Sequence, residues 1–521
     1  MNDNKPISFR CIAAGTVLVV SQAAGATDEA LLQVLLSNKL ITQQQYDAIV
    51  TAEQAKAAKR AAPSGELPLP RQEDGLLDVL LANGVITQAQ FAALQVKNAD
   101  ERAKKQESEE AKVTLKDGLK IKSASGDFSA QIGAYAQLDT AFYGDQGDTD
   151  FANGTELRRA RLSMSGTVFR DWDYKLEADF AGTTQASGTT NNVTITDAYM
   201  RYNGLKPVAI TAGSFKVPFS LEAVSSAKYI TFMERGLPFA FLNLRSLGAM
   251  ASTGGDNWTG AVGLFGETVT TQNVDDEGWG PAARLTWAPV WKKDRVLHLG
   301  VGGQYRVPGD NANGSLRERV RFRSKPESNI ISDNLAQCGS PTDAGCGAFP
   351  AGQGRSSGRL VDTGNISGDV NHYTLGGLEA AAVYGPFSLQ GEYTRADVDR
   401  DTGENLSFDG YYVYGSWFLT GESRNYRADK GTFDVLQPKN NFSLRSGGRG
   451  AWEIGIRFSS IDLNDENVTG GQEDNLTVGL NWYPNPYMRL MANYVNVLDV
   501  EGGAHDGEAI DAVQFRAQVA Y

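Results

Sequence analysis

The segment NLTVGLNW, residues 475–482, decides the fold class of this chain. Apolar side chains occupy every second position, and small or polar residues stand between them. Successive side chains of an extended backbone point to opposite faces, so one face is apolar and the other is polar. The apolar face holds Leu476, Val478, Leu480 and Trp482, and the opposite face holds Thr477, Gly479 and Asn481. The pattern predicts a β-strand with one apolar and one hydrated face.

The same alternation continues from about Gly118 to the end of the chain. In YKLEADF (174–180), the polar face carries Lys175, Glu177 and Asp179, and the last segment, DAVQFRAQVAY (511–521), ends on an aromatic residue. Sixteen such strands are expected. They start near Asp127, Glu156, Asp173, Val193, Val208, Leu247, Asn257, Gly278, Arg295, Val370, Pro386, Phe408, Ala451, Asn475, Tyr487 and Asp511.

An even number of amphipathic strands, with tight turns at one end and longer loops at the other, predicts an antiparallel transmembrane β-barrel. A soluble all-β protein would bury the apolar faces in a core instead. Charged residues along most of the non-apolar faces favour the 16-stranded barrel. We expect this barrel to comprise residues 114–521 and to lie in the outer membrane of a Gram-negative cell. Aromatic residues near tight turns are expected to form an interfacial girdle: Trp172, Tyr174, Trp482, Tyr483 and Tyr487.

The N-terminal part of the chain has a different character. Residues 1–26 combine Lys5 and Arg10 with an apolar stretch and small residues before Ala26, which predicts a secretory signal peptide cleaved after that residue. No run of 18 or more apolar residues follows it, so a bundle of membrane-spanning helices is excluded.

Residues 27–113 contain an internal repeat: LLQVLLSNKLITQQQYDAIV from Leu31 and LLDVLLANGVITQAQFAALQ from Leu76. Each copy is predicted to be a helical hairpin whose second helix starts with a capping box, such as Thr87 with Gln90. We expect a small α-helical periplasmic region. It is either an oligomerisation or cell-wall-facing module or a dispensable spacer, and the sequence leaves both open.

Cysteine and acidic residues point to structural roles. Cys338 and Cys346 stand eight residues apart in a Gly- and Pro-containing segment of an exported chain, which predicts a local disulfide. No His lies near enough to complete a zinc site, and we expect neither a metal nor a cofactor. The run Asp397, Asp399 and Asp401 has some calcium-loop spacing but lacks the Gly and the final acid of such a loop, so an acidic loop is favoured.

A row of cations stands out in a chain with a formal net charge of -13. The stretch SLRERVRFRSK (315–325) places cations at every second position, namely Arg317, Arg319, Arg321, Arg323 and Lys325. A barrel of sixteen strands is too wide for wall side chains to fill, so the insertions 217–246 and 307–369 are expected to fold inward. Cations lining such a bore would attract anions and conduct them through successive shallow sites. The alternative is a hydrated external strand that binds lipopolysaccharide phosphates.

Over roughly residues 115–521 the chain resembles the phosphate-selective porins of the O/P type. The resemblance rests on LRRARLSMSGTVFRDWDYKLEADF, on DAYMRYNGLKPVAITAGSFKVPFSLEAVSSAKYITFMERGLP, on GYYVYGSWFLTGESRNYRADKGTFDVLQP and on LTVGLNWYPNPYMRLMANYV. It implies a homotrimer of barrels whose pores carry an arginine ladder leading to a lysine-rich constriction. By this resemblance Arg317, Arg319, Arg321 and Arg323 belong to the ladder, Arg158 and Arg159 lie at the mouth, and Asp197 and Lys228 lie near the constriction.

Two positions depart from the family pattern. Ala223 replaces a lysine after Leu-Glu in the third loop, and Asp173 replaces a lysine after Asp-Trp in the first periplasmic turn. Without these two lysines, we expect general anion permeability to be retained better than a dedicated phosphate site.

The sequence therefore predicts an outer-membrane channel for passive diffusion of anions, with phosphate or phosphorylated anions as the leading solutes. Two alternatives stay open: a broad-specificity porin without a phosphate site, and an envelope-tethering structural barrel. No catalytic motif is present and no enzymatic activity is expected. The expected partners are inorganic anions, outer-membrane lipid and lipopolysaccharide, and a periplasmic or cell-wall partner for the helical repeats; no nucleic acid is expected.

Overall fold

A computed structural model describes residues 42–43, 81–97, 111–115, 118–144, 151, 153–181, 193–269, 276–309, 320–330 and 359–521. The chain divides into two units, Met1–Glu101 and Arg102–Tyr521. In the first unit residues 88–97 are helical, and the predicted capping box is confirmed: Thr87 N donates to Gln90 Oε1 at 2.8 Å and Gln90 N donates to Thr87 Oγ1 at 3.3 Å. The proposed signal peptide and almost all of the first repeat copy lie outside the described residues. No helix in the described ranges is long and apolar enough to cross a membrane.

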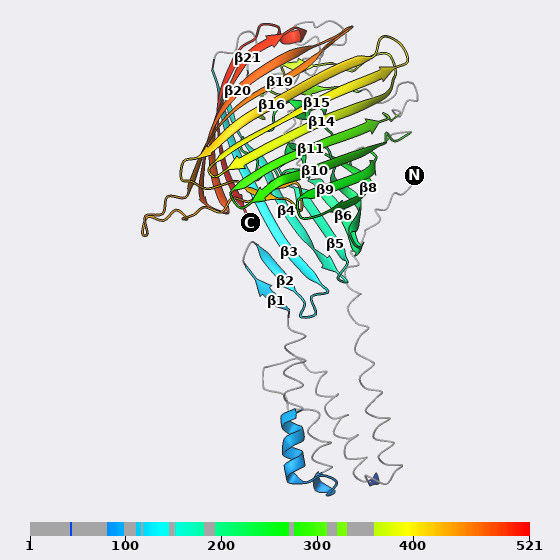
Figure 1. The fold of residues 1–521 in the computed structure, drawn as a ribbon, viewed down its shortest axis with the longest axis vertical. Coiled ribbons are helices and arrows are strands. Elements are labelled where there is room, and N and C mark those ends of the chain that lie inside the picture. The colour runs from blue at the N-terminus through cyan, green and yellow to red at the C-terminus, as the bar shows by residue number, and fades with distance from the viewer. Residues whose placement is uncertain are drawn as a thin grey trace, which may run out of the picture. The chain divides into compact units, whose positions relative to one another are not determined.

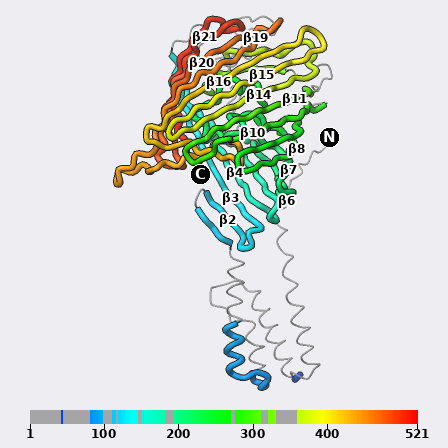
Figure 2. Tube along the Cα trace, in the orientation of Figure 1, coloured from blue at the N-terminus to red at the C-terminus, as the bar shows by residue number. Residues whose placement is uncertain are grey.

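The second unit is a closed antiparallel barrel of sixteen strands, as predicted (Figure 1). Its strands are β3 (Ser129–Tyr143), β4 (Gly154–Val168), β5 (Trp172–Asp179), β6 (Thr194–Leu205), β7 (Val208–Lys216), β8 (Arg245–Gly254), β9 (Trp258–Phe265), β10 (Gly280–Lys292), β11 (Arg295–Arg306), β14 (Val370–Tyr384), β15 (Phe387–Arg400), β16 (Leu406–Phe418), β19 (Ala451–Asp465), β20 (Val468–Asn485), β21 (Met488–Glu501) and β22 (Ile510–Ala520). Strand β22 pairs with β3 from Ala512↔Tyr143 to Ala520↔Tyr135, so the last strand closes on the first (Figure 2). Two short strands, β1 (Lys112–Thr114) and β2 (Leu119–Lys122), extend the sheet beside β3.

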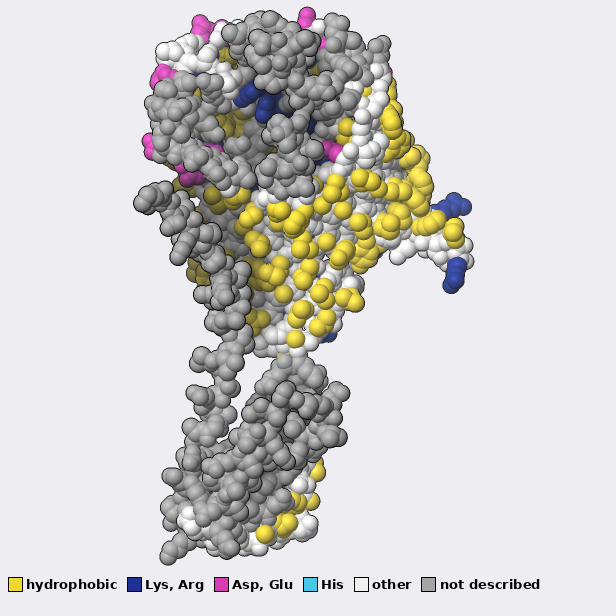
Figure 3. All heavy atoms as spheres, turned by 180° about the vertical axis from the view of Figure 1, so that it is seen from behind, with side chains coloured by type: hydrophobic (Ala, Val, Ile, Leu, Met, Phe, Trp, Pro, Cys, Tyr) yellow, Lys and Arg dark blue, Asp and Glu magenta, His cyan; other side chains and the backbone are white. Residues whose placement is uncertain are grey.

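Burial in this barrel is inverted relative to a soluble protein. In the segment 475–482, Val478 and Leu480 are 37% and 41% exposed, whereas Thr477 and Asn481 are fully buried. Large apolar side chains cover the outside of the wall (Figure 3), and charged and amide side chains fill the inside. Only a lipid environment makes this arrangement stable, so the soluble all-β alternative is excluded.

Strand positions agree closely with the alternation in the sequence, with one clear difference. The strand expected to start near Asn475 begins at Val468, because β19 and β20 continue beyond the apolar pattern as a polar hairpin that turns at Glu466. The sequence predicts Tyr483 in the lipid-facing aromatic girdle, but its side chain lies on the inner side of the wall. It alternates with the outward Trp482, turns to the lumen, and its hydroxyl donates to Glu453 at 2.7 Å.

The expectation of uniformly short turns at one end and long loops at the other is wrong in three places. At the loop end, β15–β16 and β19–β20 are joined by the short segments 401–405 and 466–467. At the turn end, residues 419–450 form a long connection with two further strands, β17 (Asn425–Arg427) and β18 (Thr432–Asp434). Turn ends face the periplasm in barrels of this kind, so this connection is periplasmic.

The bore is filled largely by loops, as its width requires. Loop 3 (residues 217–244) contains α5 (Leu221–Val224) and the 3₁₀ helix η1 (Leu237–Phe241). Loop 5 (residues 307–369) contributes β12 (Arg323–Ser324) and β13 (Val361–Asp362). Phe241 of loop 3 and Phe322 of loop 5 meet edge to face at 5.3 Å within an apolar cluster. A 3₁₀ helix, η3 (Gly503–His505), lies between β21 and β22.

The polar face of the segment 475–482 receives these loops. A Cβ at Gly479 would lie 3.2 Å from the Phe232 ring of loop 3, so a larger residue there would push this ring away. Asn481 donates to the carbonyl of Thr231 at 3.0 Å, and Thr477 donates to Glu327 of loop 5. Small and polar residues at inward positions thus make room for the loops and hold them.

Candidate functional site

Arg158 and Arg159 are consecutive residues of β4, yet both face the bore. Consecutive residues of a regular strand would face opposite sides. Here Leu157 pairs with Leu138 and Arg159 pairs with Gln137, so Arg158 is the extra residue of a β-bulge. The bulge turns both guanidinium groups inward and leaves Leu157 49% exposed on the lipid face.

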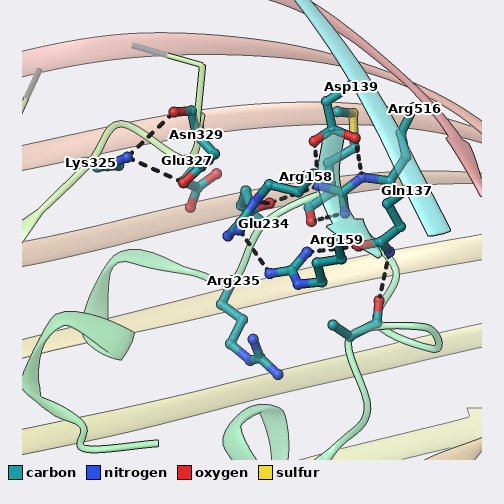
Figure 4. A network of polar contacts seen from close by, with 12 residues as sticks. Gln137, Asp139, Arg158, Arg159, Glu234, Arg235, Lys325, Glu327, Asn329 and Arg516 are labelled. Carbon is teal, nitrogen blue, oxygen red and sulfur yellow. Dashed lines mark hydrogen bonds and ion pairs between the residues drawn. The ribbon is translucent and has the colours of Figure 1, made fainter. Parts of the chain in front are cut away.

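Both arginines meet Glu234 of loop 3 (Figure 4). Arg158 Nε lies 2.9 Å from Glu234 Oε1, and Arg159 Nη2 lies 3.7 Å from Oε2. Arg516 of β22 reaches the same carboxylate at 2.7 Å and also binds Asp139 at 2.6 Å. Burial alone would raise the pKa of Glu234, but the three arginines lower this pKa well below its ordinary value. Glu234 is therefore an anion that ties loop 3 to the wall.

A second set of wall side chains holds loop 3 through its main chain. Arg489 donates to the carbonyls of Ile230 and Thr231 at 2.6 and 2.7 Å. Arg457 donates to the carbonyl of Glu234 at 3.0 Å, and Arg516 donates to that of Met233. These arginines are buried and bound to protein carbonyls, so they position the loop instead of meeting solutes.

Asp197 lies at a second bulge, in β6. Glu177 pairs with Asp197 and Ala178 pairs with Ile195, so Thr196 is extra and both Thr196 and Asp197 are turned inward and buried. Asp197 binds Arg245 at 2.6 Å and also binds Lys175. The predicted acidic residue is thus an anchor for two cations.

These residues border a cavity of about 660 Å³ between loop 3 and the wall formed by β4 to β9. Its lining includes nine Lys or Arg residues and three Asp or Glu residues. The cations are Arg159, Arg161, Lys175, Arg201, Lys216, Arg235, Arg245, Arg284 and Lys430, and the acids are Glu177, Asp197 and Asp429. The lining thus carries more cations than acids, although Arg161 and Arg284 also pair with Asp179 and Glu379, which lie outside it.

An adjoining cavity of about 400 Å³ shares Lys175 and Lys430 with the first and is also lined by Lys228. The ammonium of Lys228 lies 5.4 Å from the ring centres of Tyr135 and Tyr229. Neither Lys228 nor Lys430 forms an ion pair with any carboxylate of the described ranges. Burial lowers the pKa of Lys228. Two lysines without a direct ion pair to a described carboxylate therefore line this path, which Glu177 and Asp434 also border.

The cationic stretch 315–325 is described only from Val320 onward; Arg317 and Arg319 lie outside the described residues. From Val320 to Lys325 the predicted alternation is confirmed, because Val320, Phe322 and Ser324 are buried between more exposed cations. Arg321 Nε binds Asp362 at 2.6 Å, while Arg323 is exposed. The role of the stretch as an arginine ladder stays a prediction.

Lys325 connects this stretch to strand β4 through Asn329 and Glu156. Its ammonium lies 3.2 Å from Asn329 Oδ1 (Figure 4). Asn329 in turn donates to Glu156 at 2.7 Å. Burial, reinforced by the charges of Arg359 and Arg158, lowers the pKa of Lys325 to about 8.

The other positions singled out in the sequence are the two cysteines and the acidic run Asp397, Asp399 and Asp401. Cys338 and Cys346 lie outside the described residues, so their disulfide stays a prediction. Asp397 pairs with Arg395 at 3.0 Å, and Asp399 and Asp401 accept hydrogen bonds from Asn371 at 2.9 and 2.7 Å. Across the described part of the chain no group of three or more His, Cys, Asp or Glu could hold a metal ion.

Sequence reasoning missed most of the cavity-lining cations. Arg161 lies two residues after Arg159 and therefore shares its inward face, so counting by twos from the paired arginines would have found it. Lys216 was missed at the end of β7, where its ammonium donates to the carbonyls of Ala223 and Ser225 at 2.8 and 2.6 Å. Lys216 of β7 therefore places an ammonium beside Ala223, the loop position at which the family pattern has a lysine.

Comparisons with known proteins agree with this architecture. The family described as phosphate-selective porin O and P matches residues 131–349 and 353–521. Porin O of Pseudomonas aeruginosa is 28% identical over 407 residues, which cover 74% of this chain and 86% of that protein. An uncharacterized protein of Caulobacter vibrioides is 27% identical over 366 residues, covering 68% of this chain and 65% of that protein.

Among solved structures, an anion-selective porin from Comamonas acidovorans superposes with a TM-score of 0.46 at 11% identity, covering 76% of this chain and 100% of that chain. A loop L8 deletion mutant of OmpT from Vibrio cholerae gives a TM-score of 0.45 at 11% identity with the same coverage. The family match extends over nearly the whole barrel, and the chain belongs to the phosphate-selective porin O and P family of outer-membrane porins.

Proposed function

We propose that the barrel conducts small anions across the outer membrane, with phosphate and phosphorylated anions as its preferred solutes. One observation carries this proposal: nine cations against three acids line the cavity beside loop 3. In a narrow space with low-dielectric walls, a unit charge attracts an anion several times more strongly than the ~1 kcal/mol expected at 4 Å in water.

The arrangement of the cations also suits conduction. Arg158, Arg159 and Arg516 share Glu234, and Lys175 and Arg245 share Asp197, so much of their charge is balanced. Lys228 and Lys430 form no direct ion pair with a described carboxylate. An ion is then attracted into the path by a few unbalanced groups and can leave again, as a channel requires.

Phosphate preference is the finer part of the proposal. Guanidinium groups bind phosphate oxygens in bidentate fashion, and Arg161, Arg201 and Arg245 line the same cavity. Ala223 and Asp173 remove two cations of the family pattern, which favours a second candidate: a general anion pore without a phosphate site. We also propose a homotrimer in outer-membrane lipid and lipopolysaccharide, with no enzymatic role. The repeats at 27–113 are proposed to contact a periplasmic or cell-wall partner.

Planar-bilayer recordings test this function. Purified protein in a KCl gradient is expected to give a reversal potential of the sign that marks anion preference, and phosphate is expected to reduce the chloride current. Replacing Lys228 and Lys430 together with Gln is expected to weaken both effects. The exposed turn residues Lys292 and Lys293, replaced with Gln, serve as the matched control. Cation preference would refute the anion channel, chloride current unaffected by phosphate would support the general pore, and no conductance would support the tethering barrel.

A further inference from the structure

A separate feature lies on the outside of the barrel, at its periplasmic end. Residues 437–450, here called the finger, leave the long connection after β18 and project from the wall before β19 begins (Figure 3). Ser443 and Gly448 pair across it, so the finger is a narrow hairpin. Leu444 at its tip is 90% exposed, and Phe442 is 44% exposed. A single exposed apolar residue is common on protein surfaces, so a covering surface is indicated only by what surrounds this tip.

The base of the finger is fixed to the lipid-facing aromatic belt. Phe442 packs edge to face on Trp482 at 5.1 Å, and Trp482 stacks on Trp452 at 5.5 Å. Trp482 Nε1 donates to the carbonyl of Arg449 at 2.9 Å, and Phe442 N donates to the carbonyl of Pro484 at 2.7 Å. The finger is therefore held at the height where tryptophans mark the membrane interface.

The finger has a charge opposite to that of the chain as a whole. Between Asp434 and Glu453 there is no acidic residue, whereas Lys439, Arg445 and Arg449 are all present and exposed. Three cations beside an apolar tip at the edge of a membrane form a surface complementary to anionic lipid headgroups with acyl chains beneath them.

We propose that the finger binds anionic phospholipid of the periplasmic leaflet, with Leu444 inserted among the acyl chains and Arg445 and Arg449 on the headgroup phosphates. The base of the finger packs on Trp482, which stacks on Trp452, and both tryptophans lie at the membrane interface. The bilayer is therefore the surface that the finger meets. The proposal does not depend on what passes through the bore.

The test measures lipid affinity of the full-length porin. Binding of short-chain phosphatidylglycerol is measured by native mass spectrometry in detergent, with phosphatidylcholine as the neutral comparison. The double change R445E/R449E is expected to weaken phosphatidylglycerol binding by at least about tenfold, and added salt is expected to reduce wild-type binding. The change K292E/K293E is the matched control, because both lysines are exposed at another turn of the same rim.

Insertion of Leu444 into the bilayer is measured in a separate fluorescence experiment. In a C338S/C346S background, an environment-sensitive dye on L444C is expected to shift to the blue in phosphatidylglycerol vesicles, whereas the same dye on N440C at the base is expected to shift less. Heat-modifiable mobility shows that each variant has folded. Equal loss of binding in K292E/K293E would overturn the proposal, as would unchanged binding in R445E/R449E. Loss of oligomers in R445E/R449E with unchanged lipid binding would also overturn it and assign the finger to a second copy of this chain.

Discussion

Arg158 and Arg159 are adjacent in the chain, and both guanidinium groups reach the carboxylate of Glu234. The bulge in β4 makes this possible, because it removes the alternation that would send one of them into lipid. The wall thereby presents two positive charges at one point, and loop 3 places one partly buried negative charge opposite them. We expect the balance of charge at this point to affect how strongly the bore attracts an anion.

The change E234Q is expected to increase the anion-to-cation permeability ratio. It removes the carboxylate that Arg158, Arg159 and Arg516 share, so Arg158 and Arg159 lose this partner while Arg516 keeps Asp139. The amide keeps the shape of the side chain. Removing one partner from a buried ion pair costs roughly 3–5 kcal/mol, so a lower unfolding temperature is expected as well. Reversal potentials measure the first effect and thermal denaturation in detergent the second. E404Q, at an exposed turn, is the control, and an unchanged ratio in E234Q would contradict the prediction.

Anion preference is expected to decline with rising pH because of Lys325. The pKa of this ammonium is about 8, so the group is mostly charged at about pH 7 and mostly neutral at about pH 9. The charge is lost as pH rises, and anion permeability falls with it. In K325R the charge persists and the decline should be absent; K325Q should show a low, flat profile. Reversal potentials across this pH range measure the effect, and identical profiles for wild type and K325Q would exclude Lys325 as the source.

The change R489Q is expected to loosen loop 3. Two hydrogen bonds from a charged donor to the carbonyls of Ile230 and Thr231 are lost, each worth about 1.5–3 kcal/mol. Single-channel recordings should show a larger and noisier conductance, and limited proteolysis should cut within residues 217–244. R170Q, which affects an exposed turn, should behave like the wild type. A quiet channel of unchanged size in R489Q would show that the other wall residues suffice.

Removal of residues 27–101 is expected to leave conductance and selectivity unchanged, because this segment falls within a separate unit of the chain. Bilayer recordings of the truncated and full-length proteins provide the comparison. If the repeats bind a periplasmic or cell-wall partner, sedimentation of the full-length protein with purified cell wall should be lost on truncation. A changed conductance would indicate that the repeats act on the pore itself.

The wall was predictable from sequence because its determinant is local. Side chains alternate with a period of two against lipid on one side and water or loops on the other, and this alternation placed the sixteen strands to within a few residues except at β20. The two bulges were not predictable in the same way. A single extra residue in β4 or β6 leaves no signature of its own in a sequence, although "RR" at 158–159 conflicts with an outward position and could have been read as a sign of one.

The partners of the cations were beyond sequence reasoning. Glu234 and Arg516 are 282 residues apart, and only closure of the barrel and inward folding of loop 3 bring them together. The sequence could not separate cations that bind loop carbonyls, such as Arg489, from cations without a direct ion pair to a described carboxylate, such as Lys430. The long periplasmic connection was also missed, because its two short strands carry no sustained alternation.

Besides the Glu234 carboxylate, the wall holds loop 3 by its backbone, through carbonyl groups that every amino acid possesses. Arg489, Arg457 and Asn481 grip residues 230 to 234 without regard to which side chains those residues carry. Substitutions in the loop at positions other than Glu234 can therefore alter the solute path while the loop keeps its position. Because these main-chain contacts hold loop 3 in place, selectivity can change by single side-chain substitutions in the loop. Related pores can therefore acquire different solutes while the barrel stays the same.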